Sequence, residues 1–238
     1  MADTAGSLLP TPKPWTVPSR GLAVFHGSGE TARLSHYFLP RLLLEGKRIL
    51  VLDGANSADP RLMARLARER GIAFGQFSRQ IQIARAFTCF QLTELIARVP
   101  RFLENFPAQV LIVTALPDLY FDGDVRDWDA RVAFERALGD LRRYGGGDVC
   151  PVASGGPADA GPPSEFGDPA HGGLKETRSP SEFGGHRPPL QIAVFCSAPN
   201  FTPAPSRKRF FEQTCAAATE VWKFSLGGGG RAKLEIGN

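Results

Sequence analysis

Short apolar runs alternate with helix-patterned segments along most of this chain, and that alternation limits the folds that it can adopt. Lys47–Asp53 (KRILVLD) and Gln109–Thr114 (QVLIVT) contain continuous apolar, β-branched runs, as strands do when helices cover both faces of a parallel sheet. Helical spacing of apolar residues is found at Pro60–Arg70, at Phe90–Phe106 and from about Asp127 to Arg143. The repeated order of strand and helix predicts an α/β fold with a mostly parallel sheet and helices on both faces.

The remaining predicted elements complete this pattern. They are strands at Gly21–Phe25, Ile81–Phe87 and Gln191–Cys196, a helix from Thr31 to about Leu44 that Pro40 bends or shortens, and two strand-like runs at Glu220–Leu226 and Arg231–Ile236. Four glycines join the last two runs, so we expect a C-terminal hairpin there that extends the sheet in antiparallel fashion.

Two segments are expected to lie outside the folded domain. Residues 1–19 contain four prolines and are interpreted as a disordered lead-in. Residues 145–190 are rich in Gly, Pro and Ser, and the sequence Pro-Ser-Glu-Phe-Gly occurs in them twice. This composition buries too little apolar surface to fold, so we interpret the segment as a disordered insertion. Residues 20–144 and 191–238 then form a single domain.

Composition excludes several classes of protein. The 238 residues are 42% hydrophobic and 22% charged, which suits a globular chain with one sizeable core. No apolar run approaches the roughly 20 residues that span a bilayer, and the N-terminus lacks the apolar region of a signal peptide, so we expect a cytoplasmic protein without a membrane partner. The four cysteines are far apart, which favours neither a disulfide framework nor a zinc site. The net charge of +4 is too small to indicate nucleic-acid binding by itself.

A glycine-rich turn links the first predicted strand to the first predicted helix. Val24–Thr31 (VFHGSGET) has the position of a phosphate-binding loop and nearly its consensus sequence, G-x-x-x-x-G-K-[ST]. Two of the defining residues differ: Val24 stands at the first glycine, and Glu30 stands at the lysine that neutralises the phosphates of a nucleotide. A carboxylate at that position repels phosphate instead of attracting it.

Two interpretations of this turn remain open. Residual nucleotide or phosphate binding would use the backbone N–H groups of Gly27, Ser28, Gly29 and Thr31 at the start of the helix. Alternatively, the turn only connects strand and helix, and Glu30 itself takes the place of the missing phosphate at the positive end of the helix dipole. The sequence supports no cofactor beyond weak binding of ATP and Mg²⁺ in this turn.

Taken in order, these segments resemble the ATPase core of the RecA/RadA recombinase superfamily, a P-loop fold. Ile81–Thr88 (IQIARAFT) is similar to the family's strand IYVARAFN, Ile49–Asp53 (ILVLD) to VIWIDTE, and Gln109–Thr114 to the Walker B strand LLIVD. Thr214–Ile236 is similar to the family's C-terminal hairpin. The resemblance extends over most of the predicted domain and implies a RecA-like sheet.

The departures from the family affect its catalytic residues. In the family a catalytic glutamate lies two residues beyond the strand-end aspartate, where this chain has Ala55, and the Walker B aspartate that supports Mg²⁺ falls at Thr114. With Glu30 in the turn, the phosphate lysine, the water-orienting carboxylate and the metal carboxylate are all missing. Phosphoryl transfer depends on positioning and on charge stabilisation, so the resemblance implies a degenerate ATPase fold to which no catalytic residue is assigned.

Two other sets of polar residues have competing interpretations. Asp118, Asp122 and Asp124 follow a predicted strand end, where α/β proteins place their sites, and they form either a carboxylate metal site or a solvated loop. His26 is either a general base or a turn residue, and no partner acid or nucleophile is identifiable for it. No metal ligand is therefore assigned.

A basic run lies where recombinases carry their second DNA loop. Arg207, Lys208 and Arg209 precede Phe210 and Phe211. Cations next to aromatic rings suit the backbone and bases of single-stranded DNA, which makes the first four of these residues candidate DNA contacts. The alternative is a solvated helix start with both phenylalanines in the core.

Three functions are compatible with these patterns. The preferred hypothesis is a pseudo-ATPase: a RecA-like accessory or binding protein of DNA repair or recombination that does not hydrolyse ATP, with single-stranded DNA, a second copy of the chain or a RecA-like ATPase as partner. The second is an active ATP-dependent DNA recombination or repair ATPase with an unorthodox phosphate loop, in which Lys47 or an arginine of a neighbouring subunit replaces the missing lysine. The third is a structural interaction module without a DNA role.

Overall fold

The computed structural model describes residues 17–27, 31–146, 189–198, 203–226 and 232–237. All of these residues belong to one compact unit. The expected lead-in (1–19) and insertion (145–190) lie almost entirely outside the described residues.

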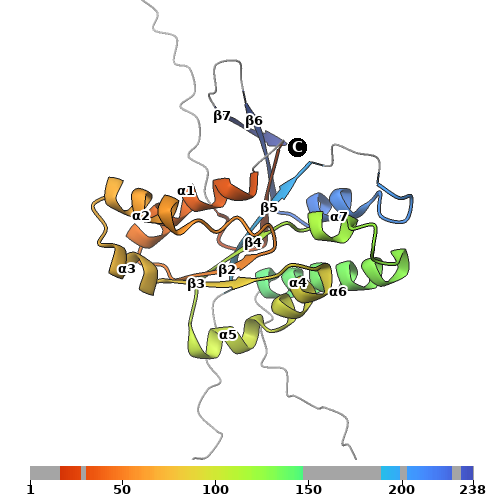
Figure 1. The fold of residues 1–238 in the computed structure, drawn as a ribbon, viewed down its shortest axis with the longest axis horizontal. Coiled ribbons are helices and arrows are strands. Elements are labelled where there is room, and N and C mark those ends of the chain that lie inside the picture. The colour runs from red at the N-terminus through yellow and green to blue at the C-terminus, as the bar shows by residue number, and fades with distance from the viewer. Residues whose placement is uncertain (1–16, 28–30, 147–188, 199–202, 227–231, 238) are drawn as a thin grey trace, which may run out of the picture. The chain divides into compact units, whose positions relative to one another are not determined.

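Seven strands form one sheet in the order β3-β2-β4-β5-β1-β6-β7 (Figure 1). Their bounds are β1 Leu22–Gly27, β2 Ile49–Asp53, β3 Ile81–Arg85, β4 Val110–Thr114, β5 Gln191–Ser197, β6 Glu220–Leu226 and β7 Ala232–Gly237. Strands β1 to β6 all run parallel, which confirms the predicted α/β class with a mostly parallel sheet.

The C-terminal strands join the sheet differently from the prediction. β6 lies beside β1 and parallel to it, with Phe25 opposite Trp222, and is therefore not an antiparallel extension. Among the described strands, β7 alone runs antiparallel, along the other side of β6. The reason is the connection from β5, which crosses past β1 and includes helix α7 (Phe210–Ala216). A strand reached by such a crossover runs parallel to the strand before it.

Helices cover both faces of the sheet, as the alternation predicts. One face carries α1 (Thr31–Leu44), α2 (Pro60–Glu69) and α3 (Phe74–Arg79), and the other carries α4 (Cys89–Ala97), α5 (Val99–Asn105), α6 (Asp127–Gly146), α7 and the short 3₁₀ helix η1 (Asp118–Phe121). Figure 1 shows α1 and α2 above strands β2 and β3, and α5 below them. None of the described helices is both long enough and apolar enough to cross a membrane.

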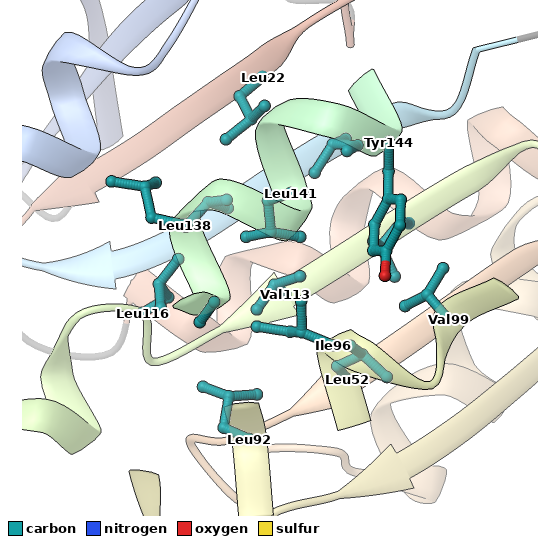
Figure 2. Packing of buried hydrophobic residues seen from close by; sticks show 14 of the residues in the cluster. Leu22, Leu52, Leu92, Ile96, Val99, Val113, Leu116, Leu138, Leu141 and Tyr144 are labelled. Carbon is teal, nitrogen blue, oxygen red and sulfur yellow. The ribbon is translucent and has the colours of Figure 1, made fainter. Parts of the chain in front are cut away.

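The central strand β4 shows why its sequence is continuously apolar. Val110, Leu111, Ile112 and Val113 are all fully buried. Leu111 and Val113 belong to the core on the α4–α6 side, and Val110 and Ile112 belong to the core on the α1–α3 side. Figure 2 shows Val113 among apolar side chains of α4 and α6. Every position of such a strand loses water on folding, which removes the alternation of polar and apolar residues.

Three local differences from the expected helices have physical causes. The helical pattern of residues 90–106 is split into α4 and α5 at Arg98, because Pro100 has no N–H to donate to the carbonyl four residues before it. α1 runs through Pro40 to Leu44 without being shortened. The sequence pattern does not predict α3, whose six residues are too few to show a helical period.

Candidate functional site

The carboxyl ends of the parallel strands gather several residues that the sequence singles out. Gly27 ends β1 and Thr31 begins α1, so the glycine-rich turn lies at this edge of the sheet. Asp53 ends β2 and Thr114 ends β4 at the same edge, directly opposite each other in the ladder. The other three residues of the turn, Ser28, Gly29 and Glu30, lie outside the described residues.

Gly27 has a packing reason to be glycine. A Cβ atom at this position would lie 2.6 Å from the carbonyl oxygen of Phe224 on β6 and 3.0 Å from Oγ1 of Thr31. Side chains do not approach a backbone oxygen that closely, so β6 would have to move to admit one. The neighbouring strand therefore requires this glycine, whether or not the turn binds phosphate.

Two polar atoms beside the turn have no hydrogen-bond partner among the described residues. They are Oγ1 of Thr31, a residue that is only 1% exposed, and Nδ1 of His26. A buried hydroxyl left unpaired costs about 1–3 kcal/mol. The first turn of α1 itself carries no acidic residue, and Glu30, which directly precedes α1, lies outside the described residues.

His26 packs against an aromatic ring on the α7 side of the sheet. The centroid of its ring lies 5.1 Å from that of Phe211, in an edge-to-face arrangement. Burial, and secondarily the charge of Lys223, lowers the pKa of His26 and favours the neutral imidazole. Neither contact supplies the acid or nucleophile partner that a general base needs.

Asp53 is a buried carboxylate whose hydrogen-bonding capacity is used within the protein. Its Oδ1 accepts hydrogen bonds from Oγ1 of Thr114 (3.0 Å) and from the N–H of Ser57 (3.0 Å), and its Oδ2 accepts one from the N–H of Ala58 (2.9 Å). The guanidinium of Arg85 lies 3.8 Å from Oδ2 and balances the charge. A buried carboxylate held in this way is satisfied by the protein alone.

Thr114 closes this network at the position that resembles a Walker B aspartate. Its hydroxyl donates to Asp53 and accepts a hydrogen bond from the N–H of Ala55 at 3.1 Å. The resemblance places a water-orienting glutamate at Ala55 and a metal-binding aspartate at Thr114. In this structure the backbone N–H of Ala55 is hydrogen-bonded to the side chain of Thr114. Neither side chain can bind Mg²⁺ or activate water as a carboxylate does.

A buried histidine, for which the sequence pattern gives no signal, links α1 to α2. Nε2 of His36 accepts a hydrogen bond from the N–H of Asp59 (3.1 Å), so Nδ1 carries the proton and donates to the carbonyl of Arg33 (2.9 Å). Asp59 in turn caps α2 by accepting from the N–H groups of Arg61 and Leu62. Burial lowers the pKa of His36, which keeps the ring neutral in this link.

The acidic loop after β4 has a buried part and an exposed part. The carboxylate of Asp118 accepts from the N–H of Ser197 at the end of β5, at 2.9 Å for Oδ2 and 3.3 Å for Oδ1. Burial raises the pKa of Asp118 to about 6, while the hydrogen bonds from Ser197 act in the opposite direction. Asp122 and Asp124 are exposed. The described part of the chain contains no group of three or more His, Cys, Asp or Glu side chains that could hold a metal ion.

Arg207, the first residue of the basic run, is an interior residue. It is 3% exposed, and its Nε pairs with Oδ1 of Asp127 at 2.8 Å. Its two terminal nitrogens donate to the carbonyls of Tyr120, Asp122 and Val125. The guanidinium therefore fastens the segment before α7 to the loop between β4 and α6, and its donors are directed inward.

The rest of the basic run divides between core and surface. Phe210 is 2% exposed, and its ring stacks on Phe134 of α6 with centroids 4.4 Å apart. Lys208 and Arg209 are exposed. Of the four candidate DNA contacts, only these two present their side chains to solvent, because Arg207 and Phe210 are used in packing.

Lys47 lies at the opposite edge of the sheet from the glycine-rich turn. Its Nζ donates to Oε1 of Gln191 (2.8 Å) and pairs with Glu45 (2.9 Å). Lys47 precedes β2 and Gln191 begins β5, so both lie at the amino ends of the strands, whereas the turn follows the carboxyl end of β1. Lys47 therefore cannot take the place of the missing phosphate lysine.

No family model matches this chain, and no curated protein matches its sequence.

Lowering the pH should destabilise the protein through His36. Because burial lowers the pKa of this residue below its ordinary value of 6.5, the unfolded chain takes up a proton before the folded one, and stability is lost as the pH falls below that value. We expect a His36→Gln variant to lose less unfolding free energy than the parent between about pH 7.5 and about pH 5.5 in urea denaturation. Asp118, whose raised pKa gives the opposite trend, is present in both proteins and cancels in the comparison. Equal losses in the two proteins would contradict the role of His36.

Replacing Arg207 should destabilise the fold, whereas replacing its neighbour should not. Arg207→Ala leaves three carbonyls without their charged donor, so we expect the free energy of unfolding to fall by at least about 3 kcal/mol. Arg209→Ala, at an exposed position, is the matched control and should change it by less than about 0.5 kcal/mol. Chemical denaturation followed by circular dichroism measures both. Similar values for the two variants would show that Arg207 is not a structural residue.

Proposed function

We propose that this chain is a RecA-like accessory or binding protein of DNA repair or recombination that does not hydrolyse ATP. The observation that carries the proposal is the closed network of Asp53, Thr114 and Ala55 at the carboxyl edge of the sheet. Phosphoryl transfer needs carboxylates that face Mg²⁺ and the attacking water. Here the side chain of Thr114 is hydrogen-bonded to Asp53 and to the backbone of Ala55 instead. Glu30 also disfavours ATP hydrolysis, because its negative charge repels the phosphates of a nucleotide.

The RecA-like identity of the fold is itself part of the proposal. Its support is the order of the similar segments in the sequence, together with a parallel sheet that brings the glycine-rich turn and the Asp53 network to one edge. This edge is where open α/β sheets place their ligands. A second copy of the chain or a RecA-like ATPase is the protein partner that this identity suggests.

One observation favours a second candidate, weak phosphate binding without hydrolysis. Oγ1 of Thr31 is buried at the start of α1 and lacks a partner among the described residues. A phosphate oxygen at the helix N-terminus would satisfy it. An active ATPase is less well supported, because Lys47 lies at the wrong edge of the sheet and only an arginine from a neighbouring subunit is left to replace the missing lysine.

Single-stranded DNA is the proposed ligand, and Lys208 and Arg209 are its proposed contacts. Both side chains are exposed at the turn before α7, and the buried Arg207 and Phe210 fix that turn to the core. Two adjacent cations on a rigid turn attract phosphate groups but read no base. We therefore expect binding that is sensitive to salt and tolerant of sequence.

Nucleotide assays on the parent and on Glu30→Lys test the central claim. With Mg²⁺ and ATP, the parent should show no turnover above background. Glu30→Lys should bind ATP about ten-fold more tightly than the parent, because a repulsive charge becomes attractive, and should still not hydrolyse it. Glu69→Lys on α2 makes the same change of charge away from the turn and should leave ATP binding as in the parent. Turnover by the parent would overturn the proposal and favour the ATPase alternative.

Salt-dependent binding of labelled oligo(dT) tests the DNA role. Lys208→Ala/Arg209→Ala should weaken binding and reduce the slope of log affinity against log salt by about 1.4, or about 0.7 for each lost phosphate contact. Arg68→Ala/Arg70→Ala removes two exposed arginines at the end of α2 and should leave the slope unchanged. If the parent binds no single-stranded DNA at low salt, the DNA role fails and the structural interaction module becomes the better hypothesis.

A further inference from the structure

A groove lies at the outer edge of the sheet, away from the glycine-rich turn. It has a volume of about 420 Å³ and is lined by Gln82, Arg98, Arg101, Phe102 and Asn105. Gln82 belongs to β3, the last strand of the described sheet on this side, which leaves the groove open. In sheet order β3 and β1 are four strand spacings apart, or about 19 Å. The groove is thus a separate place from the turn that follows β1.

Helix geometry brings four of the lining residues onto one stripe. Arg98 is the N-cap of α5, and residues 101, 102 and 105 follow it at steps of three and four along that helix. Gln82 approaches from the sheet: it pairs in register with Leu50, whose side chain belongs to the core on the α4–α6 side. Gln82 therefore points to the same side of the sheet as α5.

The polar groups of this groove are mostly unused by the protein. Arg98 pairs through Nε with Glu94 at 2.7 Å, and within the described part of the chain its terminal nitrogens have no partner. Arg101 makes no ion pair or hydrogen bond with a described residue, and the same holds for the side-chain amides of Gln82 and Asn105. Arg98 has a structural role in its ion pair with Glu94. Arg101, Gln82 and Asn105 have no comparable interaction with a described residue.

The chemistry of the lining defines a ligand class. None of the five residues is acidic, and two guanidinium groups supply the planar, forked donors that phosphate oxygens accept well. The two amides each offer a donor and an acceptor, which suits the edge of a purine base. Phe102, half-buried, adds an apolar wall against which a ring can pack. The volume lies within the range of about 300–1,000 Å³ that small-molecule sites occupy.

We propose that this groove binds a nucleoside monophosphate. Arg98 and Arg101 hold the phosphate, the amides of Gln82 and Asn105 bond to the base, and Phe102 contacts its ring. The site goes beyond the proposed DNA function and does not depend on it, since it uses neither the glycine-rich turn nor the basic run before α7.

Calorimetric titration of the full chain with AMP tests the proposal. We expect the parent to bind AMP, and Arg98→Ala and Arg101→Ala each to weaken binding about ten-fold through loss of a charge-assisted hydrogen bond. Asn105→Asp keeps the shape of the side chain and adds a negative charge, so it should weaken AMP binding at least as much. Arg79→Ala, in the last turn of α3 on the other face of the sheet, is the control and should bind AMP like the parent.

Two further ligands separate a nucleotide site from a simple anion site. Inorganic phosphate and adenosine should each bind at least about ten-fold more weakly than AMP, because each lacks half of the contacts. Phosphate binding as tight as that of AMP would overturn the assignment of the amides and Phe102. The proposal fails outright if millimolar AMP gives no heat, if Arg101→Ala binds like the parent, or if Arg79→Ala weakens binding equally. Circular dichroism spectra and melting curves confirm that each variant is folded.

Discussion

The buried carboxylate of Asp53 holds the carboxyl edge of the sheet together. It accepts hydrogen bonds from Thr114 at the end of β4 and from the loop that leads into α2, and Arg85 at the end of β3 balances its charge. A buried charge is costly unless it is paired and fully hydrogen-bonded, so one group fixes the relative positions of three segments. The same hydrogen bonds leave little free capacity on the oxygens of this carboxylate, so its interactions with the protein account for its burial.

The class of fold could be predicted because hydrophobic pattern reports burial. β2 and β4 are buried at every position, and their continuous apolar runs indicate strands covered on both faces. The hydrophobic pattern does not show the direction of a strand or its place in the sheet. Whether β6 runs parallel or antiparallel to β1 depends on the path of the crossover through α7, which no local period encodes. The split between α4 and α5 depends on a single residue, Pro100, within an otherwise continuous helical pattern.

Residues of the candidate site could be predicted only where their spacing from a nearby strand or glycine identifies them. Ala55 and Thr114 could be located by their offsets from a strand end, and both are hydrogen-bonded at the carboxyl edge of the sheet. Arg207 and Asp118 are different, because their partners lie 80 and 79 residues away in sequence. A charged residue in a polar run looks solvated, and only the folded chain shows that its donors or acceptors are directed inward. The sequence before α7 therefore suggests three cations that could contact a ligand, whereas only Lys208 and Arg209 are exposed.

Gly27 shows how packing can fix a glycine within a turn that resembles a phosphate-binding loop. The carbonyl of Phe224 on β6 leaves no room for a side chain there, so packing alone retains the glycine. Ala55, by contrast, is exposed, so a larger side chain at that position would not have to displace a strand. A glycine in such a turn is therefore weak evidence of phosphate binding until the packing around it is known.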